Sequence, residues 1–294
     1  MESMKALDKL GFPSNTKLLI IHADDAGLSH SENLATMGAL QNGCVNSYSI
    51  MVPCPNFEEI ADFAIVNDQF DYGIHLTLTC EWKNYKWSPV LSINEVPSLV
   101  DGNGSFHSSK ETFRDCAIPK EVKNELRAQI DKALAYGLQP THLDCHMYTL
   151  GLNLDFFKIY KELGIEYGLP VFLSKQIIES FNLKAEEYIK EIDFYVDEVF
   201  IGNYEVFKNG NLLDYYKGIL NNIKEGLNIL LLHPAIDDEE MRDICIDHPN
   251  FGAQWRQIDL DFTSSEHCKE LLKKNDIQLI TWGDIKEKLY SSSI

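Results

Sequence analysis

Residues 18–27, LLIIHADDAG, join an apolar run to two adjacent carboxylates. A buried strand that ends in Asp24 and Asp25 needs a compensating positive charge, because an unpaired carboxylate is strongly disfavoured away from water. A bound cation is one such charge. Adjacent strand residues face opposite sides of a sheet, so both aspartates reach one site only if the strand turns there. The Ala26-Gly27 pair permits that turn.

Three later segments add imidazoles to apolar runs. They are GIHLT with His75, THLDCH with His142 and His146, and LLLHP with His233. Reactive side chains collect at the carboxyl ends of parallel strands, so these groups are expected to meet at one edge of the sheet. The joint pattern, more than any single residue, predicts a metal site.

The spacing in THLDCH constrains which groups can bind one ion. In an extended strand His142, Asp144 and His146 share a face, yet the two histidines stand ~13 Å apart, from four steps of about 3.3 Å. We therefore expect His146, at the strand end, to bind the metal. His142 and Asp144 are expected to lie deeper and to orient His146.

Several residues have simpler interpretations when taken alone. A single strand histidine is more often a hydrogen-bonded core residue, which is the interpretation for His22. His107, His248 and His267 are assigned to ordinary loop or helix positions. Cys145 lies between two histidines, but its side chain alternates to the opposite face, so a nucleophilic role is disfavoured.

The elements that position these groups alternate along the chain. Predicted strands are 17–23, 46–52, 72–78, 141–147, 169–173, 198–201, 228–232 and 277–281. Predicted helices run from the Ser29–Glu32 capping box to Gly43, over 57–66, from Pro119 to Gly137, over 155–163 and 212–225, and from Ser264 to Lys274. About eight such units suit a closed or nearly closed α/β barrel similar to the TIM fold. An open doubly wound sheet is the alternative, but its G-x-G-x-x-G signature is missing.

Residues 81–109 lack a helical period and are expected to form a long loop or small hairpin over the active-site end of the barrel. Trp82, Tyr85 and Trp87 within it could offer aromatic faces to a sugar ring, although such residues are more often core. No boundary interrupts residues 1–294, which predicts a single domain. Arg256 is expected to brace Asp24 or bind substrate, with a surface salt bridge as the alternative.

Composition narrows the class of partner. A net charge of −19 argues against nucleic acid and against anionic membrane surfaces, since both require a basic face. The chain is 45% hydrophobic and 24% charged, as in ordinary globular proteins. Seven cysteines without a C-x-x-C pair indicate reduced thiols in the cytoplasm. The first five residues show no signal peptide, and a homo-oligomer is compatible with the sequence.

Six segments together resemble a known family. They are ADDAG after the first strand, NGCVNSYSIMV, YGIHLTLT, PTHLDCH, LLHPA and IQLITW. In this order they resemble the YdjC-like carbohydrate deacetylases, the family of chitooligosaccharide deacetylase. Two departures affect the pocket wall: Ala26 stands where members often have Phe, and Met147-Tyr148 follows His146 where members often have histidines.

The resemblance implies a distorted (β/α) barrel related to the polysaccharide deacetylases. It implies one divalent metal ion held by Asp25, His75 and His146, with Asp24 as general base and His233 as general acid. The reaction would remove an acetyl group from an N-acetylated sugar. Two nitrogens and one oxygen suit Zn²⁺, whereas Mg²⁺ prefers oxygen ligands but is often named for the family. A metal-dependent sugar isomerase, a phosphoesterase and an inactive carbohydrate-binding protein are the alternatives.

Overall fold

The fold is described from a computed structural model that covers residues 6–246 and 248–290. Seven parallel strands form one sheet in the order β4-β3-β2-β1-β6-β5, with β7 also paired to β1. Their bounds are β1 Lys17–Ala26, β2 Ser47–Ile50, β3 Asp71–Leu76, β4 Leu143–Cys145, β5 Glu198–Ile201, β6 Gly226–Leu232 and β7 Ile277–Leu279. Seven of the eight predicted strands are therefore present.

The eighth predicted strand, 169–173, is reduced to a short link between the two edges of the sheet. Leu143 of β4 forms a single parallel bridge with Val171, and the amide of Val196 donates to the carbonyl of Leu173 ahead of β5. These contacts bring the sheet edges toward each other around a ring. The architecture confirms the predicted α/β class with a distorted (β/α) barrel.

Strand β1 lies in the interior of the sheet and pairs with three other strands. Its first half pairs with β6 on one side and β7 on the other, and its second half pairs with β6 and β2. Every residue from Leu18 to Ala26 is buried, as expected for a strand covered on both faces. Polar groups in the second half of β1 consequently lie inside the molecule.

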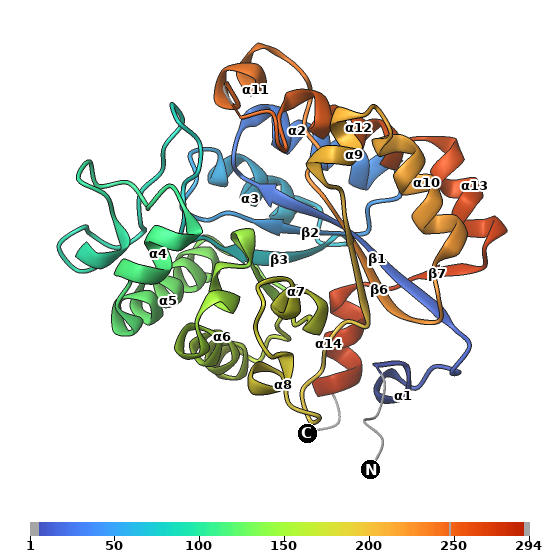
Figure 1. Ribbon diagram of the computed structural model, residues 1–294, viewed down its shortest axis with the longest axis horizontal. Helices are drawn as coiled ribbons and strands as arrows, with labels where there is room; N and C mark the ends of the chain where they lie inside the picture. Colours follow the sequence, from blue (N-terminus) through green and yellow to red (C-terminus); the bar gives the residue numbers. More distant parts are fainter. Residues whose placement is uncertain (1–5, 247, 291–294) are drawn as a thin grey trace.

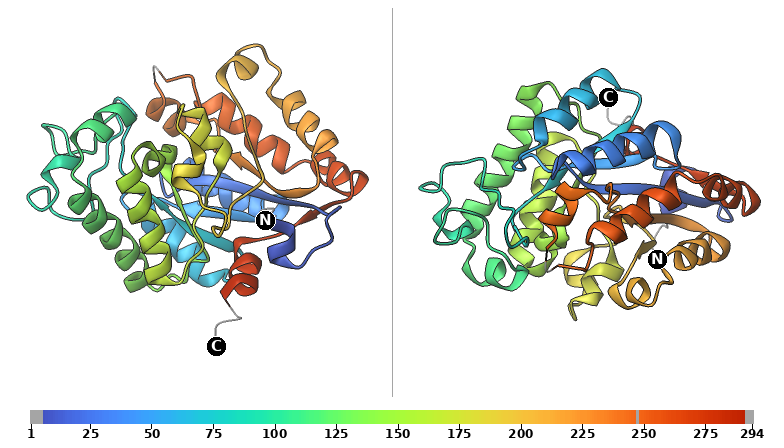
Figure 2. Two further views of the ribbon diagram at one scale, coloured as in Figure 1. Left: turned by 60° about the horizontal axis from the view of Figure 1, so that its bottom comes forward. Right: turned by 90° about the horizontal axis from the view of Figure 1, so that it is seen from above.

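Helices cover the outside of the strands, as Figure 1 and the two turned views of Figure 2 show. The α-helices are α1 Ala6–Leu10, α2 His30–Asn42, α3 Phe57–Val66, α4 Lys110–Cys116, α5 Pro119–Tyr136, α6 Leu154–Tyr167, α7 Lys175–Ser180, α8 Ala185–Tyr188, α9 Tyr204–Lys208, α10 Leu212–Asn222, α11 Glu239–Ile244, α12 Ala253–Thr263, α13 Glu266–Lys274 and α14 Trp282–Tyr290. Two 3₁₀ helices, η1 Pro97–Leu99 and η2 His146–Leu152, complete the described elements.

Three predicted helix ends are wrong. Helix α6 passes through Gly164, the predicted stop, and ends at Gly168, whose φ of 64° suits glycine. Gly164 is needed for packing instead, since a Cβ there would lie 2.6 Å from the Val171 side chain. Helix α10 ends three residues early, at Asn222, and α13 is capped by Ser265, not Ser264.

The segment predicted as a loop, 81–109, holds only η1 and a single antiparallel bridge between Val100 and Phe106. Its η1 turn packs against α4 and α5. Among the described residues, no helix combines the length and apolar content needed to cross a bilayer. Residues 1–5, on which the signal-peptide expectation rests, lie outside the described part of the chain.

Candidate active site

A cavity of about 430 Å³ opens at the carboxyl ends of the strands. Its polar wall carries Asp24, Asp25, His75, Glu81, Asp144, His146, His233 and Arg256. The opposite wall is largely apolar and includes Tyr148, Phe172, Ile177, Phe181, Val199, Ile201, Leu231 and Phe251. The barrel thus gathers the predicted strand-end groups at one place.

Both aspartates reach the cavity because β1 is irregular at this point. The pairing of β1 with β2 shifts register between Ala23 and Ala26, and Asp25 adopts a left-handed φ of 68°. A non-glycine residue in this region is uncommon and is typical of functional sites. The turn predicted at Ala26-Gly27 therefore begins one residue earlier, at Asp25 itself.

Asp25, His75 and His146 form the cluster implied by the resemblance. Oδ1 of Asp25 lies 3.0 Å from Nδ1 of His146 and 3.4 Å from Nε2 of His75. One possible ligand atom from each residue lies within 4.8 Å of the other two, and all three side chains are buried. Two imidazole nitrogens and a carboxylate oxygen around one point fit a divalent ion of the zinc type.

Carboxylates behind the two rings fix their orientation. Oδ1 of Asp144 lies 2.8 Å from Nδ1 of His75, which leaves Nε2 directed at Asp25. Glu81 lies 3.0 Å from Nε2 of His146 and leaves Nδ1 directed at Asp25. This carboxylate–histidine arrangement is common around metal ligands. Asp144 was predicted to orient His146 but contacts His75 instead, whereas Glu81, which contacts His146, was missed because nothing in the loop sequence distinguishes it.

Burial and neighbouring charges compete at these groups. Burial raises the pKa of Asp25, but His146 and His75 outweigh it and hold that pKa well below the ordinary value. Burial lowers the pKa of His75, and the charge of Asp144 more than reverses this. For His146, Glu81 and Asp25 overcome burial and raise the pKa to about 9. Positive charge, carried by a proton or a metal ion, is therefore favoured at this point.

Arg256 braces Asp25 and not Asp24. Its guanidinium is 1% exposed, lies 3.0 Å from Oδ2 of Asp25 and also pairs with Glu32. The prediction of a brace for Asp24 and the surface alternative are both wrong, because α12 places Arg256 behind β1. Ser29 does cap α2, yet the Glu32 side chain pairs with Arg256. Of the two bonds of the predicted capping box, the one in which the Ser29 side chain accepts from the amide of Glu32 is therefore present, and the Glu32 side chain pairs elsewhere.

Asp24 lies beside the metal-type cluster without belonging to the same trio. Its Oδ1 is 3.3 Å from Nε2 of His22, and its Oδ2 is 3.6 Å from Nε2 of His233. Burial is the main reason that the pKa of Asp24 is raised, to about 6. The carboxylate therefore binds a proton more readily than an exposed aspartate does, and it lines the cavity.

His233 follows β6 and faces the same cavity. Its backbone amide donates to Asp259, and its ring packs against Phe251 at 4.7 Å between centroids. Nδ1 is buried and has no hydrogen-bond partner among the described residues. Burial lowers the pKa of His233 to about 3, so the ring is neutral near pH 7.

The aromatic residues of the 81–109 segment divide into two groups. Trp82 lines the cavity beside His248, with 4.8 Å between ring centroids. Tyr85 donates its hydroxyl to the carbonyl of Leu28, and Trp87 donates its indole N–H to the carbonyl of Thr79. Neither Tyr85 nor Trp87 is among the residues that line the cavity, because the loop turns them into the protein. His248, assigned to an ordinary loop position, is at the cavity wall.

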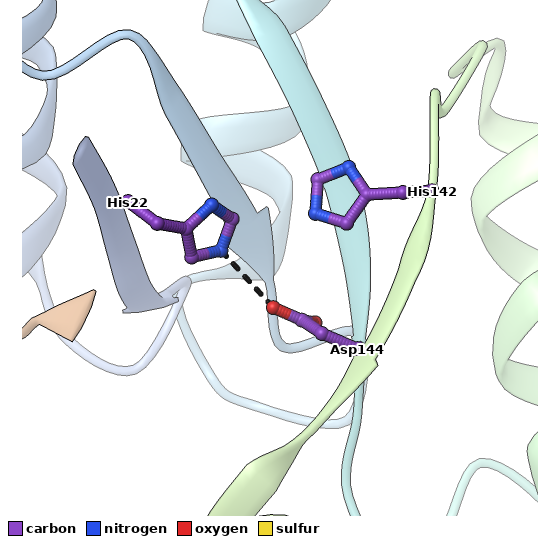
Figure 3. Close-up of side chains that lie close together, drawn as sticks. All are labelled: His22, His142 and Asp144. Atoms are coloured by element: carbon purple, nitrogen blue, oxygen red, sulfur yellow. Dashed lines mark hydrogen bonds and ion pairs between the residues drawn. The ribbon is translucent and has the colours of Figure 1, made fainter. Parts of the chain in front are cut away.

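His22 and His142 lie close to Asp144, as Figure 3 shows, and of the three only Asp144 lines the cavity. Nδ1 of His22 lies 3.0 Å from Oγ of Ser47, so His22 is the hydrogen-bonded core histidine that we expected, and its Nε2 lies 3.0 Å from Oδ2 of Asp144. Its proximity to Asp24 was not predicted. Burial raises the pKa of Cys145 and keeps it a thiol, which agrees with its disfavoured role as nucleophile.

Comparison with known proteins gives consistent matches. Residues 18–274 match the family described as YdjC-like protein. Carbohydrate deacetylases from Brevibacillus brevis and Thermus thermophilus are each 29% identical, over 91% and 98% of this chain and 99% and 100% of those proteins. A crystal structure from Enterococcus faecalis V583, described as a candidate cellobiose-phosphate cleavage protein, has a TM-score of 0.76 and 26% identity, with 92% of this chain and 99% of that chain covered.

Proposed function

This chain belongs to the YdjC-like protein family, and on that basis we propose that it is a metal-dependent hydrolase that removes acetyl groups from N-acetylated sugars or small oligosaccharides. The relatives named carbohydrate deacetylase support the substrate class. The observation that carries the proposal is the convergence of Asp25, His75 and His146 beside Asp24 in one cavity. We further propose that residues 1–294 form a single domain.

Asp25, His75 and His146 would hold the ion through Oδ1, Nε2 and Nδ1, the atoms that face one another. When bound, a divalent ion polarises the amide carbonyl and makes a water more acidic. The donor set favours Zn²⁺ or another transition ion over Mg²⁺. We propose one divalent ion at these three residues, and activity should be assayed with both Zn²⁺ and Mg²⁺. Asp144, Glu81 and Arg256 keep the ligands oriented from behind.

Asp24 is proposed as the general base. Its carboxylate lies in the cavity next to the ligand cluster, so it can accept the proton of the attacking water. Its Oδ1 lies 3.3 Å from Nε2 of His22, at the inner side of the cavity wall. A carboxylate whose pKa is about 6 is mostly ionised near neutral pH yet still binds a proton readily.

His233 is proposed as the general acid, and the neutral state of its ring limits how it acts. Burial lowers the pKa of His233 to about 3, so it holds no spare proton before the reaction. The Oδ2 atom of Asp24 lies 3.6 Å from its Nε2. We propose that during turnover the proton accepted by Asp24 passes through His233 to the departing amine, which leaves Asp24 ionised and His233 neutral again.

The cavity accommodates a small substrate. Its volume of about 430 Å³ lies within the range of small-molecule sites. Trp82 lines this cavity, but it is 1% exposed, and its ring packs against His248 and the guanidinium of Arg256. The expected homo-oligomer and the cytoplasmic location stay predictions.

Metal analysis combined with an acetate-release screen over N-acetylated sugars tests the proposal. Replacing Asp25 or His146 with Ala should remove the metal bound by Asp25, His75 and His146. Asp24→Asn and His233→Gln should keep the metal and reduce kcat by ~10²-fold or more, the usual effect of losing acid–base help. Full activity of the Asp24→Asn variant refutes its role as base. Isomerisation, phosphate release, or sugar binding without turnover would identify the alternatives.

A further inference from the structure

A second set of metal-type donors is formed by His22 of β1, His142 and Asp144 of β4, of which only Asp144 lines the cavity. One possible ligand atom from each residue lies within 4.8 Å of the other two. The three residues are 1%, 0% and 4% exposed. In Figure 3 both rings and the carboxylate point toward a shared space. The mechanism above uses Asp144 only through its other oxygen, which faces His75.

The ring of His142 is rigidly oriented. It stacks on Trp282 with 5.0 Å between centroids and 20° between planes. A Cβ on Gly73 would lie between 2.5 and 2.7 Å from three of its ring atoms, so Gly73 packs against the ring without room for a side chain. His142 thus has one fixed orientation between Gly73 and Trp282.

Hydrogen bonding fixes the tautomer of His142. The Thr141 hydroxyl donates its proton to the carbonyl of Tyr72. Its oxygen also lies 3.0 Å from Nδ1 of His142, and because the hydroxyl proton is already used, Nδ1 must be the donor of this second bond. Nε2 then carries a lone pair. This atom is fully buried and has no hydrogen-bond partner among the described residues. A buried lone pair without a partner is costly, and a cation would satisfy it.

His22 presents a similar lone pair to a carboxylate. The Ser47 hydroxyl donates to Asp71, so its oxygen accepts from Nδ1–H of His22, at 3.0 Å. Nε2 of His22 then faces Oδ2 of Asp144 at 3.0 Å. Two acceptor atoms at this distance need either a proton or a metal ion between them.

The charge around the site favours a metal ion over a lone proton. Of the nearby carboxylates, Asp25 and Glu32 pair with Arg256, whereas Asp24 and Asp144 face His22 and Glu81 faces His146. A single divalent ion at the first cluster leaves this group of carboxylates with excess negative charge. A second divalent ion would remove most of that excess in a region of low dielectric constant.

We propose that His22, His142 and Asp144 bind a second divalent ion of the zinc type, distinct from the ion of the proposed active site. The ligand atoms would be Nε2 of both histidines and Oδ2 of Asp144. Ser49 Oγ and Asp24 Oδ1 lie 3.2 and 3.3 Å from Nε2 of His22, so either can complete four-coordination. Asp144 then connects the two sites, since its Oδ1 faces His75.

Metal content measures the second site directly. Protein stripped with a chelator is reloaded with Zn²⁺, dialysed, and analysed by mass spectrometry. His142→Phe keeps an aromatic ring between Gly73 and Trp282 but removes Nε2, so it should lose about half of the bound zinc. His267→Phe, the same change at an exposed histidine of α13, should retain all of it. Equal zinc content in wild type and His142→Phe overturns the proposal.

Two measurements keep the test valid if His142→Phe does not fold. Wild-type crystals grown with Zn²⁺ should show an anomalous scattering peak bonded to Nε2 of His142, and a peak at Asp25 and His146 alone overturns the second site. Zn²⁺ should also raise the Tm of His146→Ala, which retains only the second site. If nitrogen NMR finds His22 protonated on both nitrogens in zinc-loaded protein, a proton and not a metal ion lies between His22 and Asp144. This result refutes the second site.

The outcomes separate this inference from the proposed function. Two zinc ions per chain without acetate release refute the deacetylase proposal and leave the second site intact. Acetate release by a protein that binds zinc only at Asp25, His75 and His146 supports the deacetylase proposal and refutes the second site.

Discussion

Replacing Arg256 with methionine tests whether a buried ion pair holds the ligand Asp25. Methionine keeps much of the apolar stem but leaves Asp25 and Glu32 without their guanidinium. Removing one partner of a buried pair typically costs 3–5 kcal/mol, so we expect a loss of about 4 kcal/mol in the free energy of unfolding. Glu32 contributes to this cost because it is 0% exposed and burial already raises its pKa well above the ordinary value.

The corresponding change in Tm follows from chain length. Unfolding entropy near 60 °C is about 2.1 cal/mol/K per residue, and the chain has 294 residues. The product is about 0.6 kcal/mol/K, so a cost of 3–5 kcal/mol lowers Tm by about 5–8 °C. Loss of the brace on Asp25 should also weaken metal binding by about 10- to 100-fold.

Calorimetry of metal-free protein measures the first effect and zinc titration measures the second. Arg127→Met is the control, because Arg127 makes two hydrogen bonds to Glu166 on the surface, where ion pairs contribute little. Adding Glu32→Gln to Arg256→Met should recover part of the lost stability. If Arg256→Met melts within about 2 °C of Arg127→Met, the reasoning about this buried pair is wrong.

Three further predictions concern pH and packing. Turnover should fall as the pH drops through about 6, where Asp24 is protonated and cannot accept a proton; activity unchanged down to about pH 4 contradicts this. Gly73→Ala should cost about 1–3 kcal/mol in urea denaturation because its Cβ meets the ring of His142, whereas Gly218→Ala, with open space around it, should not destabilise. Burial raises the pKa of Asp259 to about 7 from 3.8, so the folded chain keeps a proton that the unfolded chain releases between these pH values. Stability should therefore decrease as pH rises through that window, and a variant Asp259→Asn should lack this slope.

The barrel and the site were predictable where local pattern determines structure. Apolar runs bounded by helix caps located seven of the strands, and the carboxyl-end rule brought Asp24, His75, His146 and His233 to one cavity. The distance argument in THLDCH also separated the positions of His142 and His146. The hydrophobic pattern, the residue spacing and the carboxyl-end rule were sufficient for these conclusions.

Features that depend on distant contacts could not be obtained in this way. Glu81 joins the site because its loop folds back over β4, and Arg256 reaches Asp25 because α12 packs against α2. Gly164 resembles a helix stop until Val171 is placed against it. Trp82 and Tyr85 are three residues apart in one loop, yet only Trp82 lines the cavity. Such outcomes depend on tertiary packing, which a local pattern does not contain.

The pairing of β1 also has a consequence for biosynthesis. Lys17–Leu19 lies between β6 and β7, so one edge of its first half waits for residues 277–279. At ribosomal speeds of about 5–20 residues per second, the chain from Leu232 to Ile277 takes roughly 2–9 s to emerge. During that time a nascent chain exposes an apolar strand edge, which is a template for pairing with other chains. Protection by chaperones should matter most in this late interval of translation.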